Sequence, residues 1–102
     1  MKYEIYQITN IRECDYTFMR YEFAIEKANK KFSLNDYTKV YEGEVPEQLA
    51  AKSTFEILEK LFEKFNIDHP NDFTGRSMSV SDLVKLDDKL YYCDFAGWEE
   101  IK

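Results

Sequence analysis

The chain has 102 residues, and its 14 Lys and Arg against 20 Asp and Glu give a formal net charge of −6. This acidity argues against direct binding of nucleic acid, because the phosphate backbone is bound by basic surfaces. Hydrophobic residues make up 44% of the chain, which is enough to bury a core, and the length predicts one domain over residues 1–102.

The start of the chain carries no pattern typical of a targeting or membrane segment. Glu4 and Gln7 interrupt any apolar run there, and no stretch reaches the roughly 18 apolar residues that a membrane span needs. Cys14 and Cys93 are far apart without metal-ligand spacing, and a disulfide between them stays open. We expect a cytoplasmic protein with two reduced thiols and no membrane association.

Strand and helix patterns alternate in the first half of the chain. In residues 2–8, Tyr3 and Ile5 would lie on one face of a strand and Tyr6 and Ile8 on the other, which predicts a strand buried on at least one side. Apolar residues at helical spacing predict a short helix over residues 21–30. Tyr37, Val40 and Tyr41 are typical of a second strand, over residues 36–44.

The most regular helical pattern covers residues 54–65. Ser53 and Glu56 form a capping box at its start. We expect Asn66 to be the C-cap, and Pro70 prevents the helix from continuing. The expected buried stripe consists of Phe55, Leu58, Leu61, Phe62 and Phe65.

The last third of the chain is typical of antiparallel sheet. Alternating residues 78–86 predict a strand, Asp87 and Asp88 a tight turn, and residues 89–93 a hairpin partner, with a last strand over residues 98–101. The whole pattern predicts an α+β fold with a mostly antiparallel sheet and two helices packed on one face. An unpaired edge strand leaves a homodimer open.

Three segments carry a resemblance to a known family. They read FNIDHPNDFTGRSMSVSDLV over residues 65–84, YYCDFAGW over residues 91–98 and DYTKVYEG over residues 36–43. The chain thereby resembles the YodL-like domain family. Where many members have Gly-His-Ser at residues 75–77, this chain has Arg76, so a role for a histidine does not carry over. The signature residues that match are Gly75, Ser77, Asp94, Gly97 and Trp98.

The resemblance implies a genomic context rather than a mechanism. Small YodL-like domains occur in Gram-positive bacteria, often on conjugative elements and phages, where they are thought to counter host defences or assist establishment. No catalytic residues are agreed for the family. The resemblance therefore implies a domain of a mobile genetic element that acts on a host protein or on a protein of the element itself.

The serine-rich part of the signature allows two interpretations. On a strand, Ser77, Ser79 and Ser81 share one face and Met78 and Val80 the other, which would enter the core. In the architectural interpretation, Gly75 gives conformational freedom and the Asp82 carboxylate accepts backbone amides. In the functional interpretation, a recognition surface consists of Arg76, Ser79, Ser81 and Asp82 and requires an exposed Arg76 without an internal partner.

Catalytic and metal-binding patterns are weak. A Cys93/His69 nucleophile pair has no motif behind it, and one His with two distant Cys does not make a zinc site. We expect no metal and no cofactor. The many tyrosines in the predicted strands, if exposed, would be anchors for a protein partner.

Three functions remain as hypotheses. The first is a non-enzymatic module that binds a host or element-encoded protein. The second is an acidic nucleic-acid mimic that inhibits a defence nuclease and requires a continuous stripe of carboxylates, although net charge of this size also keeps a small domain soluble. The third is a small hydrolase, which requires a pocket uniting Cys93 or His69 with a carboxylate.

Overall fold

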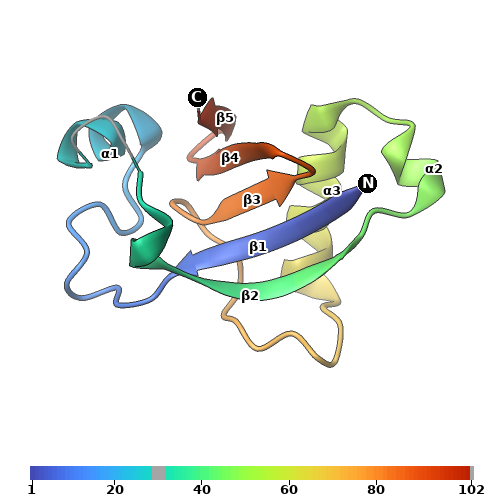
Figure 1. Cartoon of the computed structure of the whole chain (residues 1–102), viewed down its shortest axis with the longest axis horizontal. Coiled ribbons are helices and arrows are strands. Elements are labelled where there is room, and N and C mark those ends of the chain that lie inside the picture. Colours follow the sequence, from blue (N-terminus) through green and yellow to red (C-terminus); the bar gives the residue numbers. More distant parts are fainter. Residues whose placement is uncertain (29–31, 102) are drawn as a thin grey trace.

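Figure 1 shows the computed structural model, which describes residues 1–28 and 32–101. Within these residues five strands form one antiparallel sheet in the order β2-β1-β3-β4-β5. The strands are β1 Lys2–Ile8, β2 Tyr37–Glu44, β3 Leu83–Leu86, β4 Lys89–Asp94 and β5 Gly97–Ile101. The helices are α1 Tyr21–Lys27, α2 Glu47–Ala50 and α3 Thr54–Ile67, with a 3-10 turn η1 at Leu34–Asp36. The α+β class with an antiparallel sheet is confirmed.

The two longer helices cover opposite faces of the sheet, which corrects our prediction of one shared face. Val84 packs in the cluster that contains the buried side of α3, whereas Leu83 packs with Ala24 of α1. Neighbouring residues of a strand point to opposite faces, and both of these side chains are fully buried. The sheet therefore needs cover on both sides, and α3 lies behind it in Figure 1.

Helix α3 begins as the capping pattern predicts. The Ser53 hydroxyl accepts a hydrogen bond from the Glu56 amide at 3.3 Å. The rotation of the helix differs from the prediction, because Ile57 is buried and Phe55 is 53% exposed. Asn66 lies inside the helix rather than at its C-cap, which is Asp68. The buried stripe of α3 consists of Ile57, Leu58, Leu61 and Phe65.

Other predicted elements keep their type but shift their ends. Helix α1 covers the start of the expected range 21–30, and residues 29 and 30 of that range lie outside the described residues. Strand β4 runs one residue further than expected, to Asp94, and β5 starts one residue earlier, at Gly97. Helix α2 was not predicted, because four residues are too few to show a helical period.

Residues 73–82, which we call the signature loop, are not a strand. Strand β3 begins only at Leu83, so the predicted start at residue 78 is wrong. Ser81 has a φ of 85°, which an extended strand excludes. The Ser81 amide donates to the Cys93 carbonyl at 2.9 Å, and the Cys93 amide donates to the Asp82 carbonyl at 2.8 Å. Two residues of the loop thus oppose one residue of β4, as in a β-bulge.

Candidate functional site

The three serines of the signature loop do not share one face, in contrast to the prediction. Ser77 is exposed, Ser79 is half-buried and Ser81 is fully buried. Of the two apolar residues between them, Met78 is buried and Val80 is half-buried. The loop path, rather than the strand alternation, decides which side chains point inward.

Every polar group of Ser81 is hydrogen-bonded inside the protein. Its amide donates a hydrogen bond to the Cys93 carbonyl. Its hydroxyl oxygen accepts one from the Phe18 amide at 3.0 Å, and its carbonyl accepts one from the Tyr37 hydroxyl at 2.7 Å. A non-glycine residue with positive φ is strained by about 1 kcal/mol or more. These bonds hold the strained residue in place, and they join the loop to both halves of the chain.

Gln7 of β1 is the main internal partner of the signature loop. Its side-chain nitrogen donates to the Arg76 carbonyl at 2.8 Å and to the Asp82 carboxylate at 3.0 Å, while its side-chain oxygen accepts from the Arg76 amide at 3.0 Å. Gln7 is 1% exposed. No role in a site was predicted for Gln7, whose only signal in the sequence is a polar residue on the same strand face as Tyr3 and Ile5.

Gly75 is required by a close approach. A Cβ atom on Gly75 would lie 2.5 Å from the Gln7 side-chain oxygen and 2.9 Å from the Phe73 ring. The prediction was that this glycine supplies conformational freedom. The structure shows instead that the backbone passes so close to Gln7 that a side chain does not fit.

Arg76 is exposed, but it has an internal partner. Its guanidinium donates to the Ile8 carbonyl at 3.2 Å, whereas the functional interpretation required an arginine without one. Ser81 and Asp82 lie in the interior, each 0% exposed, so they do not face a partner in this conformation. Of the four residues proposed for a recognition surface, only Arg76 and the half-buried Ser79 reach solvent.

The Asp82 carboxylate is buried beneath the loop. It accepts hydrogen bonds from the Ser79 amide at 3.0 Å and from Gln7. Burial raises the pKa of Asp82 to about 6, although these bonds and the Arg76 charge act in the opposite direction. Among the described residues, the second carboxylate oxygen of Asp82 and the hydroxyl of Ser79 find no hydrogen-bond partner. This arrangement agrees with an architectural loop held by side-chain-to-backbone bonds.

A pocket of about 310 Å³ lies beside the signature loop, between α3 and the turn that joins β4 and β5. Its walls are Phe55, Glu59 and Phe62 from α3, Val80 from the loop, and residues 93–98 from the hairpin. We call it the aromatic pocket. The signature residues Asp94, Gly97 and Trp98 therefore meet α3 here, which the sequence did not predict.

The walls of the aromatic pocket are fixed by specific contacts. The Trp98 indole nitrogen donates to Glu59 at 3.0 Å, and the Trp98 and Phe62 rings meet edge to face at 6.3 Å. Gly97 has a φ of 132°, and a Cβ there would lie 2.9 Å from the Phe55 ring. Glycine at this position thus allows both the turn and the contact with Phe55.

Asp94 links the pocket to α1. One of its carboxylate oxygens accepts from the Tyr21 amide at 2.9 Å and from the Phe95 amide at 2.8 Å. The N-cap residue Arg20 makes no side-chain capping bond, so the first turn of α1 is capped by Asp94, the last residue of β4. The guanidinium carbon of Arg20 lies 5.2 Å from the centre of the Phe95 ring. The turn between β4 and β5 is therefore held against α1.

The exposed aromatic rings are phenylalanines rather than tyrosines. Tyr3, Tyr37, Tyr91 and Tyr92 are buried, and Tyr6 and Tyr41 are half-buried. The tyrosines of the strands are therefore mainly core residues. The most exposed aromatic side chains are Phe18, Phe23, Phe55 and Phe95, of which the last two line the pocket.

Cys93 also lines the aromatic pocket, but as a buried thiol. It is 4% exposed, and burial raises its pKa to about 12, so the thiol stays protonated at neutral pH. His69 is not among the residues that line this pocket. It is exposed in the loop after α3, where its Nδ1 lies 2.9 Å from the Pro70 carbonyl. The structure does not assemble the Cys93/His69 pair.

Metal-ligating side chains do not gather in the part of the chain that the structure describes. No group of three or more His, Cys, Asp or Glu side chains there is placed to hold an ion. Cys14 and Cys93 are both free thiols.

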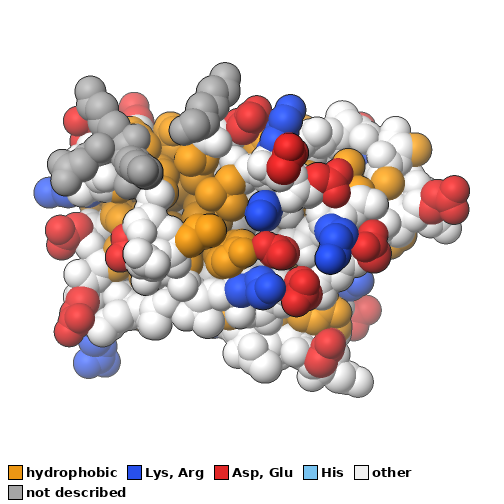
Figure 2. All heavy atoms as spheres, in the orientation of Figure 1, with side chains coloured by type: hydrophobic (Ala, Val, Ile, Leu, Met, Phe, Trp, Pro, Cys, Tyr) orange, Lys and Arg blue, Asp and Glu red, His pale blue; other side chains and the backbone are white. Residues whose placement is uncertain are grey.

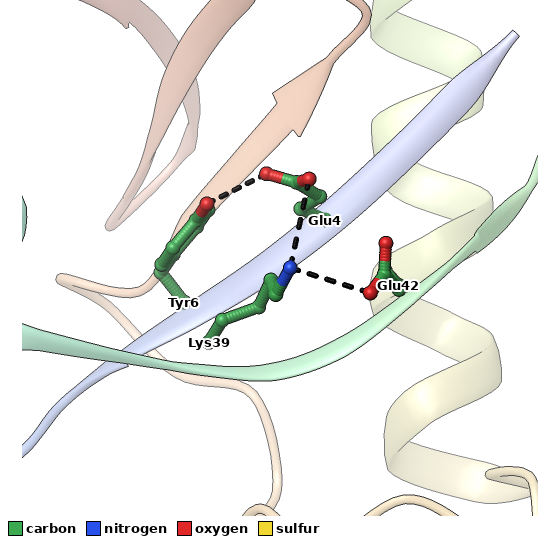
Figure 3. Close-up of polar contacts among 4 residues, drawn as sticks. All are labelled: Glu4, Tyr6, Lys39 and Glu42. Atoms are coloured by element: carbon green, nitrogen blue, oxygen red, sulfur yellow. Dashed lines mark hydrogen bonds and ion pairs between the residues drawn. The ribbon is translucent and has the colours of Figure 1, made fainter.

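The sheet face opposite α3 carries charges of both signs. The Tyr6 hydroxyl donates to Glu4 at 2.6 Å, and the Lys39 ammonium lies 3.9 Å from Glu4 and 3.3 Å from Glu42. Figure 3 shows how these four side chains lie on β1 and β2. The bond from Tyr6 lowers the pKa of Glu4, whereas burial is the main cause that raises the pKa of Tyr6 to about 12. Acidic and basic side chains alternate across this face in Figure 2. It offers no continuous stripe of carboxylates.

Comparisons with known proteins identify the family. The model of the YodL-like domain matches residues 2–102. The chain is also similar to uncharacterized protein R785 of Acanthamoeba polyphaga mimivirus, with 39% identity in an alignment of 82 residues; the match covers 69% of this chain and 73% of that protein. No solved structure matches the chain. No helix among residues 1–28 and 32–101 has the length and apolar character to cross a bilayer. The match over nearly the whole chain shows that it belongs to the family of YodL-like domains.

Proposed function

We propose that this domain is a non-enzymatic module that binds a protein through the aromatic pocket. The observation that carries the proposal is the exposure of Phe55 and Phe95, which are 53% and 71% exposed on the two sides of one pocket. Large aromatic side chains around a hollow are the usual anchors of protein interfaces. The pocket brings Cys93 together with the carboxylates of Glu59 and Asp94, as the hydrolase hypothesis requires, but burial raises the pKa of the Cys93 thiol to about 12, which favours binding over nucleophilic catalysis.

The partner that fits the family is a protein of the host or of the element that carries the gene. We place the domain in the cytoplasm, on a bacterial mobile element or phage, where it acts in counter-defence or establishment. A relative of this chain belongs to a virus, which supports an origin among mobile elements. The face in Figure 2 has charges of both signs and therefore does not itself support a nucleic-acid mimic, and the net charge of −6 disfavours direct nucleic-acid binding.

A comparative purification tests the proposal. Tagged wild-type protein, the double variant Phe55→Ala/Phe95→Ala and the control Leu34→Ala are expressed in a bacterium that carries such an element, and bound proteins are identified by mass spectrometry. Leu34 is a suitable control because it is 45% exposed in η1 and does not line the pocket. We expect a protein that binds wild type and Leu34→Ala but not the double variant. A partner that binds all three equally would contradict the proposal.

A further inference from the structure

The aromatic pocket continues into a second hollow along α3. This hollow has a volume of about 500 Å³ and shares Glu59 and Phe62 with the pocket. It extends to Ile67, which is 79% exposed. At about 1.5 Å per residue, the stretch from Phe55 to Ile67 measures about 18 Å along the helix axis. We call the two hollows together the α3 groove, and its length suits a peptide segment rather than a single small molecule.

Negative charge is concentrated on this side of α3. The carboxylates of Glu56, Glu59, Glu63 and Asp94 line the α3 groove, against one basic side chain, Lys60. A third hollow on the other flank of the helix is lined by Lys52, Lys60 and Lys64 with a single acid, Glu63. Lys60 and Glu63 line both hollows and form an ion pair at 3.9 Å. Of the remaining charges, those on the flank with the exposed aromatic rings are acidic, and those on the other flank, Lys52 and Lys64, are basic.

Two of these carboxylates make a neutral partner unfavourable. Glu59 and Asp94 line the aromatic pocket itself. One oxygen of Glu59 accepts a hydrogen bond from the Trp98 indole, and one oxygen of Asp94 accepts hydrogen bonds from two backbone amides. Neither forms an ion pair with a described residue. An apolar side chain that covered them would remove water without supplying a counter-charge, which is costly.

A cation satisfies both parts of the pocket at once. Its charge pairs with the carboxylates, and a guanidinium also stacks on aromatic faces. The chain itself provides an example at the rim, where the Arg20 guanidinium lies 5.2 Å from the centre of the Phe95 ring. We propose that the occupant of the α3 groove is a basic amphipathic segment of the partner protein, with an Arg side chain in the aromatic pocket and apolar side chains against Phe62 and Ile67. This inference rests on the proposed function and names the chemistry of the partner.

Synthetic peptides test the inference without the natural partner. Three peptides share one Leu-rich amphipathic framework and differ only in whether Arg, Gln or Glu fills the polar positions. They contain no Trp, so the single Trp of the chain, Trp98 in the pocket wall, reports binding through its fluorescence and its indole NMR signal. We expect the Arg peptide to bind at least about tenfold more tightly than the Gln peptide, and the Glu peptide not to bind.

Matched variants locate the effect. Glu59→Gln keeps an acceptor for Trp98 but removes the charge, and we expect it to lower the affinity for the Arg peptide several-fold. Glu47→Gln makes the same change at an exposed residue of α2 outside the groove and should have no effect. Equal binding of the Arg and Gln peptides, binding of none of the three, or equal effects of the two variants would each overturn the inference. The proposed function is judged separately. A natural partner that fails to bind only the Phe55→Ala/Phe95→Ala variant would still support it, whereas a partner that binds this variant as well as wild type would refute it.

Discussion

Gln7 and Asp82 lie 75 residues apart in the sequence and share a buried hydrogen bond of 3.0 Å. Gln7 belongs to β1, and Asp82 is the last residue of the signature loop before β3. Because Gln7 also bonds to both backbone groups of Arg76, one side chain fixes the two ends of the segment from Arg76 to Asp82. The loop that carries the signature residues Gly75 and Ser77 is thereby attached to the sheet.

The first prediction concerns the Gln7 side chain. Gln7→Leu removes three hydrogen bonds and leaves a buried carboxylate with one donor fewer, so we expect a loss of about 2–4 kcal/mol in the free energy of unfolding. Urea denaturation followed by Trp98 fluorescence measures it. Gln48→Leu makes the same change at an exposed residue and should shift stability by no more than about 0.5 kcal/mol. Equal losses in the two variants would refute the role of Gln7.

The second prediction follows from the close approach of Gly75 to Gln7. Gly75→Ala places a methyl group against the Gln7 oxygen and the Phe73 ring, and we expect it to destabilise the fold by about 1–3 kcal/mol. The cost should be smaller in a Gln7→Ala background, because one of the two obstacles is gone. A double-mutant cycle by urea denaturation measures this coupling. Strict additivity would show that the two residues do not interact as described.

The third prediction concerns the pH dependence that Asp82 causes. Its pKa is about 6 in the folded protein against an ordinary value of 3.8, so the folded chain binds more protons between these values. The free energy of unfolding should therefore fall as pH rises from about 4 to about 6, by an amount on the order of 2 kcal/mol.

Asp82→Asn removes this ionisation and keeps a side-chain oxygen that accepts hydrogen bonds. Relative to wild type, the variant should gain stability near pH 7 and lose the advantage near pH 4, as measured by urea denaturation at several pH values. Asp88→Asn, at an exposed turn residue, is the control and should leave the pH profile of the wild type unchanged. An Asp82→Asn profile that parallels the wild type would mean that Asp82 ionises as an exposed carboxyl does.

These residues also show how far the sequence predicts the structure. The alternation in residues 2–8, the capping box at Ser53 and the tight turn at Asp87 are local signals, and β1, α3 and the β3–β4 hairpin form where they indicate. The signature loop is different, because its path depends on Gln7 and Phe18, which lie far from it in the sequence, and on the Asn66 side chain of α3, which accepts a hydrogen bond from the Met78 amide. A local pattern of serines between apolar residues cannot reveal such partners, so it was interpreted as a strand.

The aromatic pocket was missed for a related reason. The spacing of apolar residues in 55–65 predicts a helix, but they cover more than one stripe, so the spacing alone does not fix which of them face the sheet. Burial of Ile57 turns Phe55 outward, toward Gly97 of the hairpin. The signature residues Asp94, Gly97 and Trp98 were identified, whereas their partners on α3 depend on tertiary packing.

The fourth prediction concerns the two thiols. In native protein at pH 8, Cys93 should react with a disulfide reagent such as DTNB at least about a hundredfold more slowly than in urea, because its thiol is buried and has a raised pKa. Cys14→Ser isolates Cys93 for this measurement, and Cys93→Ser isolates the half-buried Cys14, which should react faster. Rapid labelling of native Cys93 would reopen the hypothesis of a nucleophilic enzyme.

The affinity of the purified partner for the pocket variants tests the central claim most directly. Isothermal titration calorimetry should give a dissociation constant about a hundredfold larger for Phe55→Ala/Phe95→Ala than for wild type, as expected when two anchor side chains are lost. The Leu34→Ala control should match the wild type. If the double variant binds the partner as tightly as the wild type does, the aromatic pocket is not the binding site.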